Sequence, residues 1–216
     1  MVVGVDAGLT LLGVWAPVPS GRLGEAHGLL MVLGFVGTLV ALERAVALGS
    51  SWGYAAPVLL GLGGIGLLTL PHPAGPLLLL DGAVALVAVY VALWRRQRDE
   101  ATATQLLGAV LAVCTALLLV RLEVPATTPL MVGFLVLTIA AERVELARLA
   151  MPPAAGPVLL VLACLLAAAL LAAVVAPGTG LRAAGAVLLV LVAWLARHDV
   201  ARRLVRARGP RPWAAW

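Results

Sequence analysis

The sequence predicts an all-α membrane protein, a polytopic bundle of about eight transmembrane helices. Hydrophobic residues make up 63% of the 216 residues, charged residues make up 12%, and the mean hydropathy is +1.10. A soluble domain is usually about half apolar and about a quarter charged, so a water-soluble core cannot hide this much apolar surface. The apolar runs are continuous rather than short and alternating, which favours helices over a transmembrane barrel.

Proline, glycine and charged residues divide the chain into eight apolar segments. Most of them are close to the ~20 residues that a helix needs to cross the apolar core of a bilayer. The first is short, yet we expect it to cross as well. The segments are Val2–Pro17, Leu23–Leu48, Trp52–Leu70, Gly75–Trp94, Ala101–Val120, Pro125–Leu149, Pro157–Ala176 and Leu181–Arg197.

A repeated phrase indicates an internal duplication. The only two phenylalanines occur in Gly34-Phe35 and Gly133-Phe134, and a Glu-Arg pair follows each at the same spacing, with an offset of 99 residues. We therefore predict one integral membrane domain over residues 1–208, built from two parallel four-helix repeats over about 1–100 and about 101–208. Two repeats with an even number of helices insert the same way up. Residues 209–216 form a basic tail that contains proline and tryptophan.

Arginine placement predicts the orientation, because cytoplasmic loops are enriched in basic residues. All 15 basic residues are arginine, and the net charge is +5. We expect the protein to lie in the cell inner (cytoplasmic) membrane, with the lipid bilayer as its main partner. With eight helices, both termini are expected on the cytoplasmic side. Nucleic acid is not expected as a partner, since no soluble basic module is present. Twelve arginines fall on the cytoplasmic side (Arg44, Arg95, Arg96, Arg98, Arg143, Arg148, Arg197, Arg202, Arg203, Arg206, Arg208 and Arg211), and three fall outside (Arg22, Arg121 and Arg182).

The duplicated Glu-Arg pairs predict ion pairs between the two repeats. Neighbouring residues on a helix point ~100° apart, so Glu43 and Arg44 are not expected to face each other, and the same holds for Glu142 and Arg143. With both pairs at the same depth, Glu43 would meet Arg143 and Glu142 would meet Arg44. The alternative is that each arginine extends to the lipid head groups.

His27 is the main candidate for a cofactor ligand. On a helix, His27, Met31 and Gly34 share one face, and imidazole with thioether suits haem iron or copper(I). We predict that His27 is a metal ligand near the outer face, with Met31 beside it and His72, between two prolines on the same side, as a second ligand. The alternative is an interfacial histidine with a methionine that only packs.

The run from His27 to Phe35, with the pattern H-x3-M-x2-G-F, resembles the NnrS family of haem- and copper-containing membrane proteins. That family carries a His-Ala-His-Glu-Met run before a Gly-Phe; His27 and Met31 match it, whereas Leu29 and Leu30 replace the second histidine and the glutamate. The resemblance implies bound haem or copper and a role in redox or nitric-oxide-related metabolism. The second repeat lacks these ligands, so the site would be asymmetric or completed by a second copy of the chain or a partner membrane subunit.

Two other functions remain open on the sequence. The first is a small-solute permease with an intramembrane polar path through Asp6, Glu43 and Asp81, since carboxylates inside a membrane are functional candidates. The second is a non-catalytic membrane assembly subunit. A glycine-rich run at residues 61–66 matches a nucleotide-binding pattern by letter, but it lies within a span and is interpreted as a helix-packing surface. No set of catalytic residues emerges from the sequence.

Overall fold

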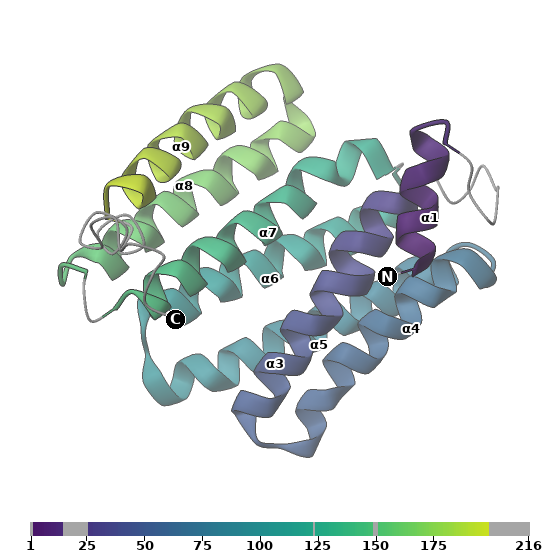
Figure 1. The fold of residues 1–216 in the computed structure, drawn as a ribbon, viewed down its shortest axis with the longest axis horizontal. Helices are drawn as coiled ribbons and strands as arrows, with labels where there is room; N and C mark the ends of the chain where they lie inside the picture. Colours follow the sequence, from purple (N-terminus) through teal and green to yellow (C-terminus); the bar gives the residue numbers. More distant parts are fainter. Residues whose placement is uncertain (1, 15–25, 123, 149–150, 199–216) are drawn as a thin grey trace, which may run out of the picture.

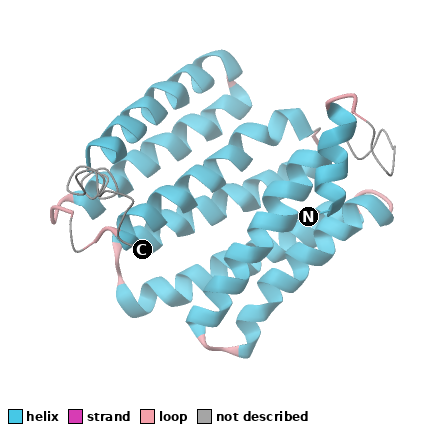
Figure 2. Ribbon diagram, viewed as in Figure 1, coloured by secondary structure: helices cyan, strands magenta, loops and turns pink. Residues whose placement is uncertain are grey.

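The computed structural model is helical throughout the residues it describes, 2–14, 26–122, 124–148 and 151–198 (Figures 1 and 2). A short helix α1 precedes seven long ones. The first long helix contains a π-helical segment η1, and the second begins with a 3-10 turn η2. The elements are α1 (Val2–Leu11), η1 (Leu30–Gly37), α3 (Thr38–Leu48), η2 (Ser51–Tyr54), α4 (Ala55–Thr69), α5 (Ala74–Gln97), α6 (Glu100–Leu119), α7 (Val124–Leu146), α8 (Ala155–Val175) and α9 (Pro177–His198).

Seven helices of the described chain are long and apolar enough to cross a membrane, which makes the protein a multi-pass membrane protein. Each coincides with one of the predicted segments after the first. The spans are Ala26–Leu48, Ser51–Thr69, Ala74–Gln97, Glu100–Leu119, Val124–Leu146, Ala155–Val175 and Pro177–His198. Short turns join successive spans, so neighbours run antiparallel (Figure 1).

The predicted first crossing, Val2–Pro17, is corrected by the structure. Helix α1 has only 10 residues. Ten residues reach about 15 Å, half of the ~30 Å apolar core. Positions 15–17 of that segment lie outside the described residues. The seven spans of the described residues do not show the two four-helix repeats, which stay a prediction, as does the placing of both termini on the cytoplasmic side. The domain boundaries remain predictions, and the tail at 209–216 lies outside the described residues.

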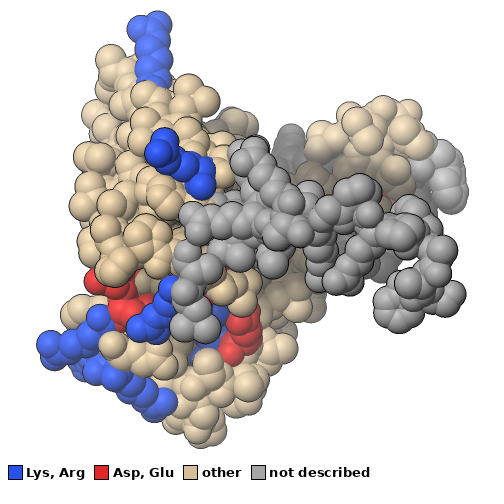
Figure 3. All heavy atoms as spheres, turned by 60° about the vertical axis from the view of Figure 1, so that its left-hand side comes forward, with Lys and Arg blue, Asp and Glu red and all other residues tan. Residues whose placement is uncertain are grey.

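The charged side chains of the described helices gather mainly at one end of the bundle. We call it the arginine-rich end; there α3 leads into η2, α5 turns into α6, α7 leads to α8, and α9 ends. It carries Arg44, Arg95, Arg96, Arg98, Arg143, Arg148 and Arg197. Figure 3 shows acidic and basic side chains close together in the lower part of one face of the molecule. Arg121 and Arg182 belong to the opposite end, whereas Arg22, Arg202, Arg203, Arg206, Arg208 and Arg211 lie outside the described residues.

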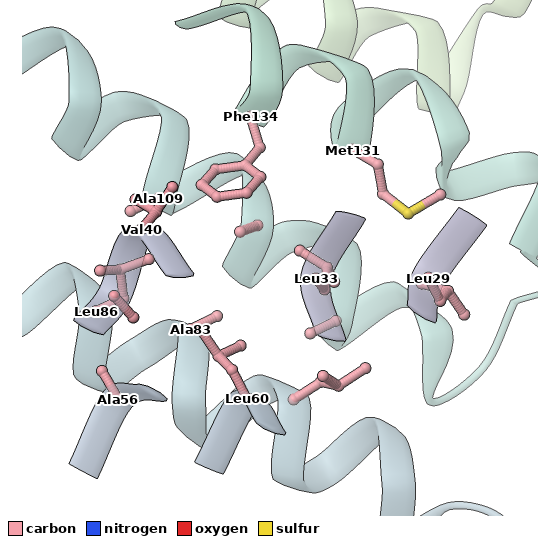
Figure 4. Close-up of a cluster of buried hydrophobic side chains, with 14 of the residues drawn as sticks. Leu29, Leu33, Val40, Ala56, Leu60, Ala83, Leu86, Ala109, Met131 and Phe134 are labelled. Atoms are coloured by element: carbon pink, nitrogen blue, oxygen red, sulfur yellow. The ribbon is translucent and has the colours of Figure 1, made fainter. Parts of the chain in front are cut away.

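Two apolar clusters hold the helices together. The first lies between η1, α3, α4, α5, α6 and α7 and includes Leu33, Leu60, Leu86 and Phe134, each at most 1% exposed (Figure 4). The second joins α6 and α7 to α8 and α9. Both clusters contain many alanines, which let helix axes approach closely where lipid provides no hydrophobic driving force for association.

The glycine-rich run on α4 packs against its neighbours at backbone distance. A Cβ added to Gly64 would lie 3.0 Å from the Cα of Gly34, and one added to Gly63 would lie 2.8 Å from the backbone nitrogen of Leu79. Small residues are required where helices touch in this way. The interpretation of residues 61–66 as a helix-packing surface is therefore confirmed.

The π-helical segment Leu30–Gly37 was not predicted from the sequence. It lies where the first long helix approaches α4, at the contact between Gly34 and Gly64. A π-helix has wider turns than an α-helix, so the side chains before and after it do not keep the α-helical register. The hydroxyl of Thr38, just after the segment, donates a hydrogen bond to the carbonyl oxygen of Gly34 at 2.7 Å.

We expect Gly63→Ala to lower the thermal stability of the detergent-solubilised protein, by about 1–3 kcal/mol, because the new methyl group meets the α5 backbone. Gly61→Ala is the matched control in the same helix. A Cβ there lies 3.7 Å from the Thr38 hydroxyl, an ordinary contact. It should be neutral or stabilising, since alanine favours a helix more than glycine does. Equal melting temperatures for the two variants would contradict the close packing of α4 on α5.

Candidate functional site

A hollow of about 720 Å³ lies at the end of the bundle opposite the arginine-rich end. We call it the outer hollow. It lies between the start of the first long helix, the turn from α4 to α5 and the turn from α6 to α7. Its wall is mainly apolar, with one imidazole and one guanidinium. The lining residues are Ala26, Leu29, Leu67, His72, Pro76, Leu119, Val120, Arg121, Leu122, Val124, Pro125 and Thr128.

His72 is placed in this wall by the turn between α4 and α5. It follows Pro71, and its peptide bond to Pro73 is cis. The Nε2 atom lies 3.4 Å from the carbonyl oxygen of Leu119 at the end of α6, a long contact. In the tautomer that donates from Nε2 to this carbonyl, Nδ1 carries a lone pair and is able to accept a proton or bind a metal. Metal-binding histidines often have this second hydrogen bond to a backbone carbonyl.

His27 faces a different neighbour. Its ring lies beside α1, since a Cβ added to Gly8 would be 3.1 Å from Cε1 of His27. The adjoining residues Ala26 and Leu29 line the outer hollow, whereas His27 is not among its lining residues. Met31 is half-buried one turn further along. The structure therefore places His27 and His72 at the same end of the molecule but does not bring them together in the wall of the hollow.

The described part of the chain contains no cluster of the acidic, histidine or cysteine side chains that bind metal ions. No group of three or more His, Cys, Asp or Glu side chains there is close enough to hold a metal ion. The two cysteines are free; Cys114 is half-buried and Cys164 is exposed. A site that depends on a single imidazole suits haem, which needs only one or two axial ligands from the protein.

At the arginine-rich end the two Glu-Arg pairs, which recur at the same spacing in the sequence, do not make equivalent contacts. The side chain of Arg44 is 12% exposed and pairs with the carboxylate of Glu43 at 2.8 Å. Its other terminal nitrogen lies 3.9 Å from Glu145 on α7. The expectation that Glu43 and Arg44 do not face each other is wrong, because two long side chains bend toward each other although their Cα–Cβ bonds diverge.

The predicted pairs between the repeats do not form among the described residues. Arg143 is exposed and makes no ion pair there, with Glu43 or any other acid. Glu142 is half-buried and acts electrostatically on Arg44, Glu43 and Glu145 without an ion pair of its own. Arg44 thus points into the junction of α3 and α7, whereas its counterpart Arg143 points away from the bundle.

Arg44 belongs to a layer of buried polar groups that was not predicted from the sequence. Tyr90 and Gln105 are 0% exposed and Thr138 is 3% exposed. The Tyr90 hydroxyl, both amide atoms of Gln105, the Thr138 hydroxyl and Nε of Arg44 are buried without a hydrogen-bond partner in the described structure. We call these four residues the inner polar layer. A usable signal was present, because the sequence has only two amide side chains, and Gln105 lies inside an apolar span whereas Gln97 ends one.

The polar path predicted for a permease is not formed. Asp6 is buried on α1, which packs beside His27 at the end opposite the arginine-rich end. Glu43 lies at the arginine-rich end with 61% of its side chain exposed. Asp81 is on an exposed face of α5. The three carboxylates therefore do not line one route through the bundle.

Comparison with family models places the whole chain in one family. The whole chain, residues 1–216, matches the model described as Domain of unknown function (DUF8744), and the protein belongs to this family. The comparisons with curated proteins and with solved structures give no match.

We expect Arg44→Gln to destabilise the protein and Arg143→Gln to leave its stability nearly unchanged. Arg44 is largely buried beside three carboxylates, so its loss removes a charged hydrogen bond, typically about 1.5–3 kcal/mol. Arg143 is exposed, and surface substitutions usually stay within about 0.5 kcal/mol. Thermal unfolding in detergent, measured for both variants, checks this. Similar losses for the two arginines would show that the repeats are equivalent after all.

Proposed function

We propose that this protein is a membrane cofactor-binding protein that holds haem in the outer hollow. The single observation that carries the proposal is the combination, in one wall, of the His72 imidazole and the Arg121 guanidinium with an otherwise mainly apolar surface. The resemblance to NnrS around His27 supports the class of cofactor and suggests a role in redox or nitric-oxide-related metabolism. The proposed ligand, however, is His72 rather than His27.

The residues present fit the chemistry of this group. Cofactor sites are typically hollows of about 300–1,000 Å³ with few polar groups, and the outer hollow has about 720 Å³. Apolar side chains such as Leu29, Leu67 and Leu119 would shield the group from water, and His72 would supply a nitrogen ligand to its iron. Arg121 would pair with the propionates. Bound haem supplies reversible electron transfer and binding of small gaseous ligands; the chain itself binds, orients and shields it.

We infer that the arginine-rich end faces the cytoplasm and that the outer hollow opens on the other side. Support comes from the described arginines, of which seven lie at the arginine-rich end and two at the opposite end. Basic residues near span ends are enriched on the cytoplasmic side of inner membranes. In this orientation α1 lies on the outer side, next to His27.

The haem proposal predicts a Soret band in protein purified from cells supplied with haem. His72→Ala should remove most of this absorption, because the axial nitrogen is lost, and Arg121→Gln should weaken haem retention during purification. His27→Ala is the matched control, a histidine at the same end that faces α1, and it should keep the band. Visible absorption and pyridine haemochrome measurements provide the readout.

Two other outcomes of this experiment would contradict the proposal. Loss of the band in His27→Ala with retention in His72→Ala would overturn the assignment of the ligand and restore the prediction made from the sequence. Wild-type protein without haem after expression with haem available would overturn the proposed function. The alternative of a non-catalytic assembly subunit would then stand.

Reporter fusions test the orientation separately. A fusion after Ala74 should report the outer side, and a fusion after Gln97 should report the cytoplasm, because α5 crosses the membrane between these residues. Alkaline phosphatase is active only outside and green fluorescent protein is bright inside, so the two reporters should give opposite patterns. An inverted pattern would place the outer hollow in the cytoplasm, and equal signals would reject α5 as a crossing.

A further inference from the structure

The residues of the inner polar layer lie toward the arginine-rich end of their helices, beside the first apolar cluster, of which Tyr90 is itself a member. Each of its members stands one helical turn from a residue of that cluster, on the side of the arginine-rich end. Spacings of three or four residues place side chains on the same face of a helix. The pairs are Ala41 and Arg44 on α3, Leu86 and Tyr90 on α5, Ala109 and Gln105 on α6, and Phe134 and Thr138 on α7.

Independent contacts support this placement. A Cβ added to Gly108, one turn from Gln105, would lie 3.6 Å from the Thr138 hydroxyl, so α6 and α7 meet there. Arg44 and three glutamates, Glu43, Glu142 and Glu145, all act electrostatically on Tyr90. Four helices thus contribute polar groups to one layer.

Thr138 behaves unlike the other threonines of the spans. The hydroxyls of five of them donate to the carbonyl oxygen four residues earlier, which satisfies the donor within the helix; they are Thr38, Thr69, Thr104, Thr115 and Thr128. The Thr138 hydroxyl makes no hydrogen bond to another group of the described structure. Its donor is therefore available to a molecule bound in the layer.

Burial of the polar atoms of this layer without any hydrogen-bond partner would lower the stability of the fold. A buried donor or acceptor without a partner costs about 1–3 kcal/mol, and the four residues of the inner polar layer carry five such atoms. Their chemistry selects the ligand. Gln105 leaves both an acceptor and a donor open, so an anion alone or a cation alone would satisfy only part of it. Water donates and accepts, and buried waters typically make about three hydrogen bonds.

We propose that the inner polar layer is an internal water-binding site that is reached from the arginine-rich end. The entry would lie on the side of Glu145, which lies 3.9 Å from Arg44 and also lines a second hollow of about 350 Å³. Toward the other end the site is closed by Phe134, Leu86 and Ala109, which point into the apolar cluster (Figure 4). The site is therefore a blind, water-filled entry into the bundle, separate from the outer hollow.

Hydroxyl-radical footprinting of the full-length protein in lipid nanodiscs tests this proposal. Radicals form from bound water, and the side chains beside it are oxidised even when they are buried. We expect Tyr90 to be labelled several-fold faster than Phe134, an aromatic residue that is equally buried in the neighbouring dry layer. Tyr54, which is 43% exposed, gives the reference for an accessible tyrosine. Equal, slow labelling of Tyr90 and Phe134 would overturn the proposal.

Substitution of Gln105 gives a second test, because the direction in which it shifts the thermal unfolding temperature depends on whether the layer holds water. If water occupies the layer, Gln105→Leu should slow the labelling of Tyr90 and lower the thermal unfolding temperature. If the layer is dry, the same change removes orphaned polar atoms and should raise that temperature, which would contradict the proposal. Thr138→Val, close in shape to threonine, repeats the test should Gln105→Leu fail to fold. Unchanged Tyr90 labelling in the folded variant would show that the water is not held in this layer.

Discussion

A polar group inside a bilayer must find its hydrogen-bond partner within the protein, because the lipid core offers none. This constraint explains most of the structure. The backbone is helical through every span, and most span threonines return their hydroxyls to their own helix. Apolar side chains face both lipid and core, so association between helices depends on close contact of small residues such as Gly34, Gly63 and Gly64.

The same constraint makes the two polar regions informative. Between the ends, the first cluster is packed mainly from leucine, alanine and valine, with Met131, Phe134 and the ring of Tyr90. The outer hollow has an imidazole and a guanidinium in its wall, and the inner polar layer leaves buried atoms without partners. A protein that only had to fill the membrane would place apolar side chains at Gln105 and Thr138. We therefore regard both regions as built for bound molecules of different kinds.

The sequence predicted the seven spans well, because a long apolar run flanked by proline, glycine or arginine has few alternatives in a bilayer. The predictions from the sequence failed for features that depend on local helix geometry or on the packing of side chains in three dimensions. Helix α1 is apolar but too short, and the π-helical segment at Gly34 has no pattern of its own. The ion pairs depended on how long side chains bend, and the partner of Arg44 on α7, Glu145, lies three residues beyond the one expected. His27 and His72 share an end, yet only the fold shows that one faces α1 and the other the outer hollow.

The central claim is that the polar groups of this bundle are concentrated at its two ends and that the inner layer holds a bound molecule rather than empty space. An electron density map of the protein in lipid, at a resolution that shows ordered water, tests it most directly. The account predicts density within hydrogen-bond distance of both the Gln105 amide and the Thr138 hydroxyl, with Arg44 directed toward Glu145. A map in which Gln105 turns away to a protein partner and no density lies beside Tyr90 would contradict it.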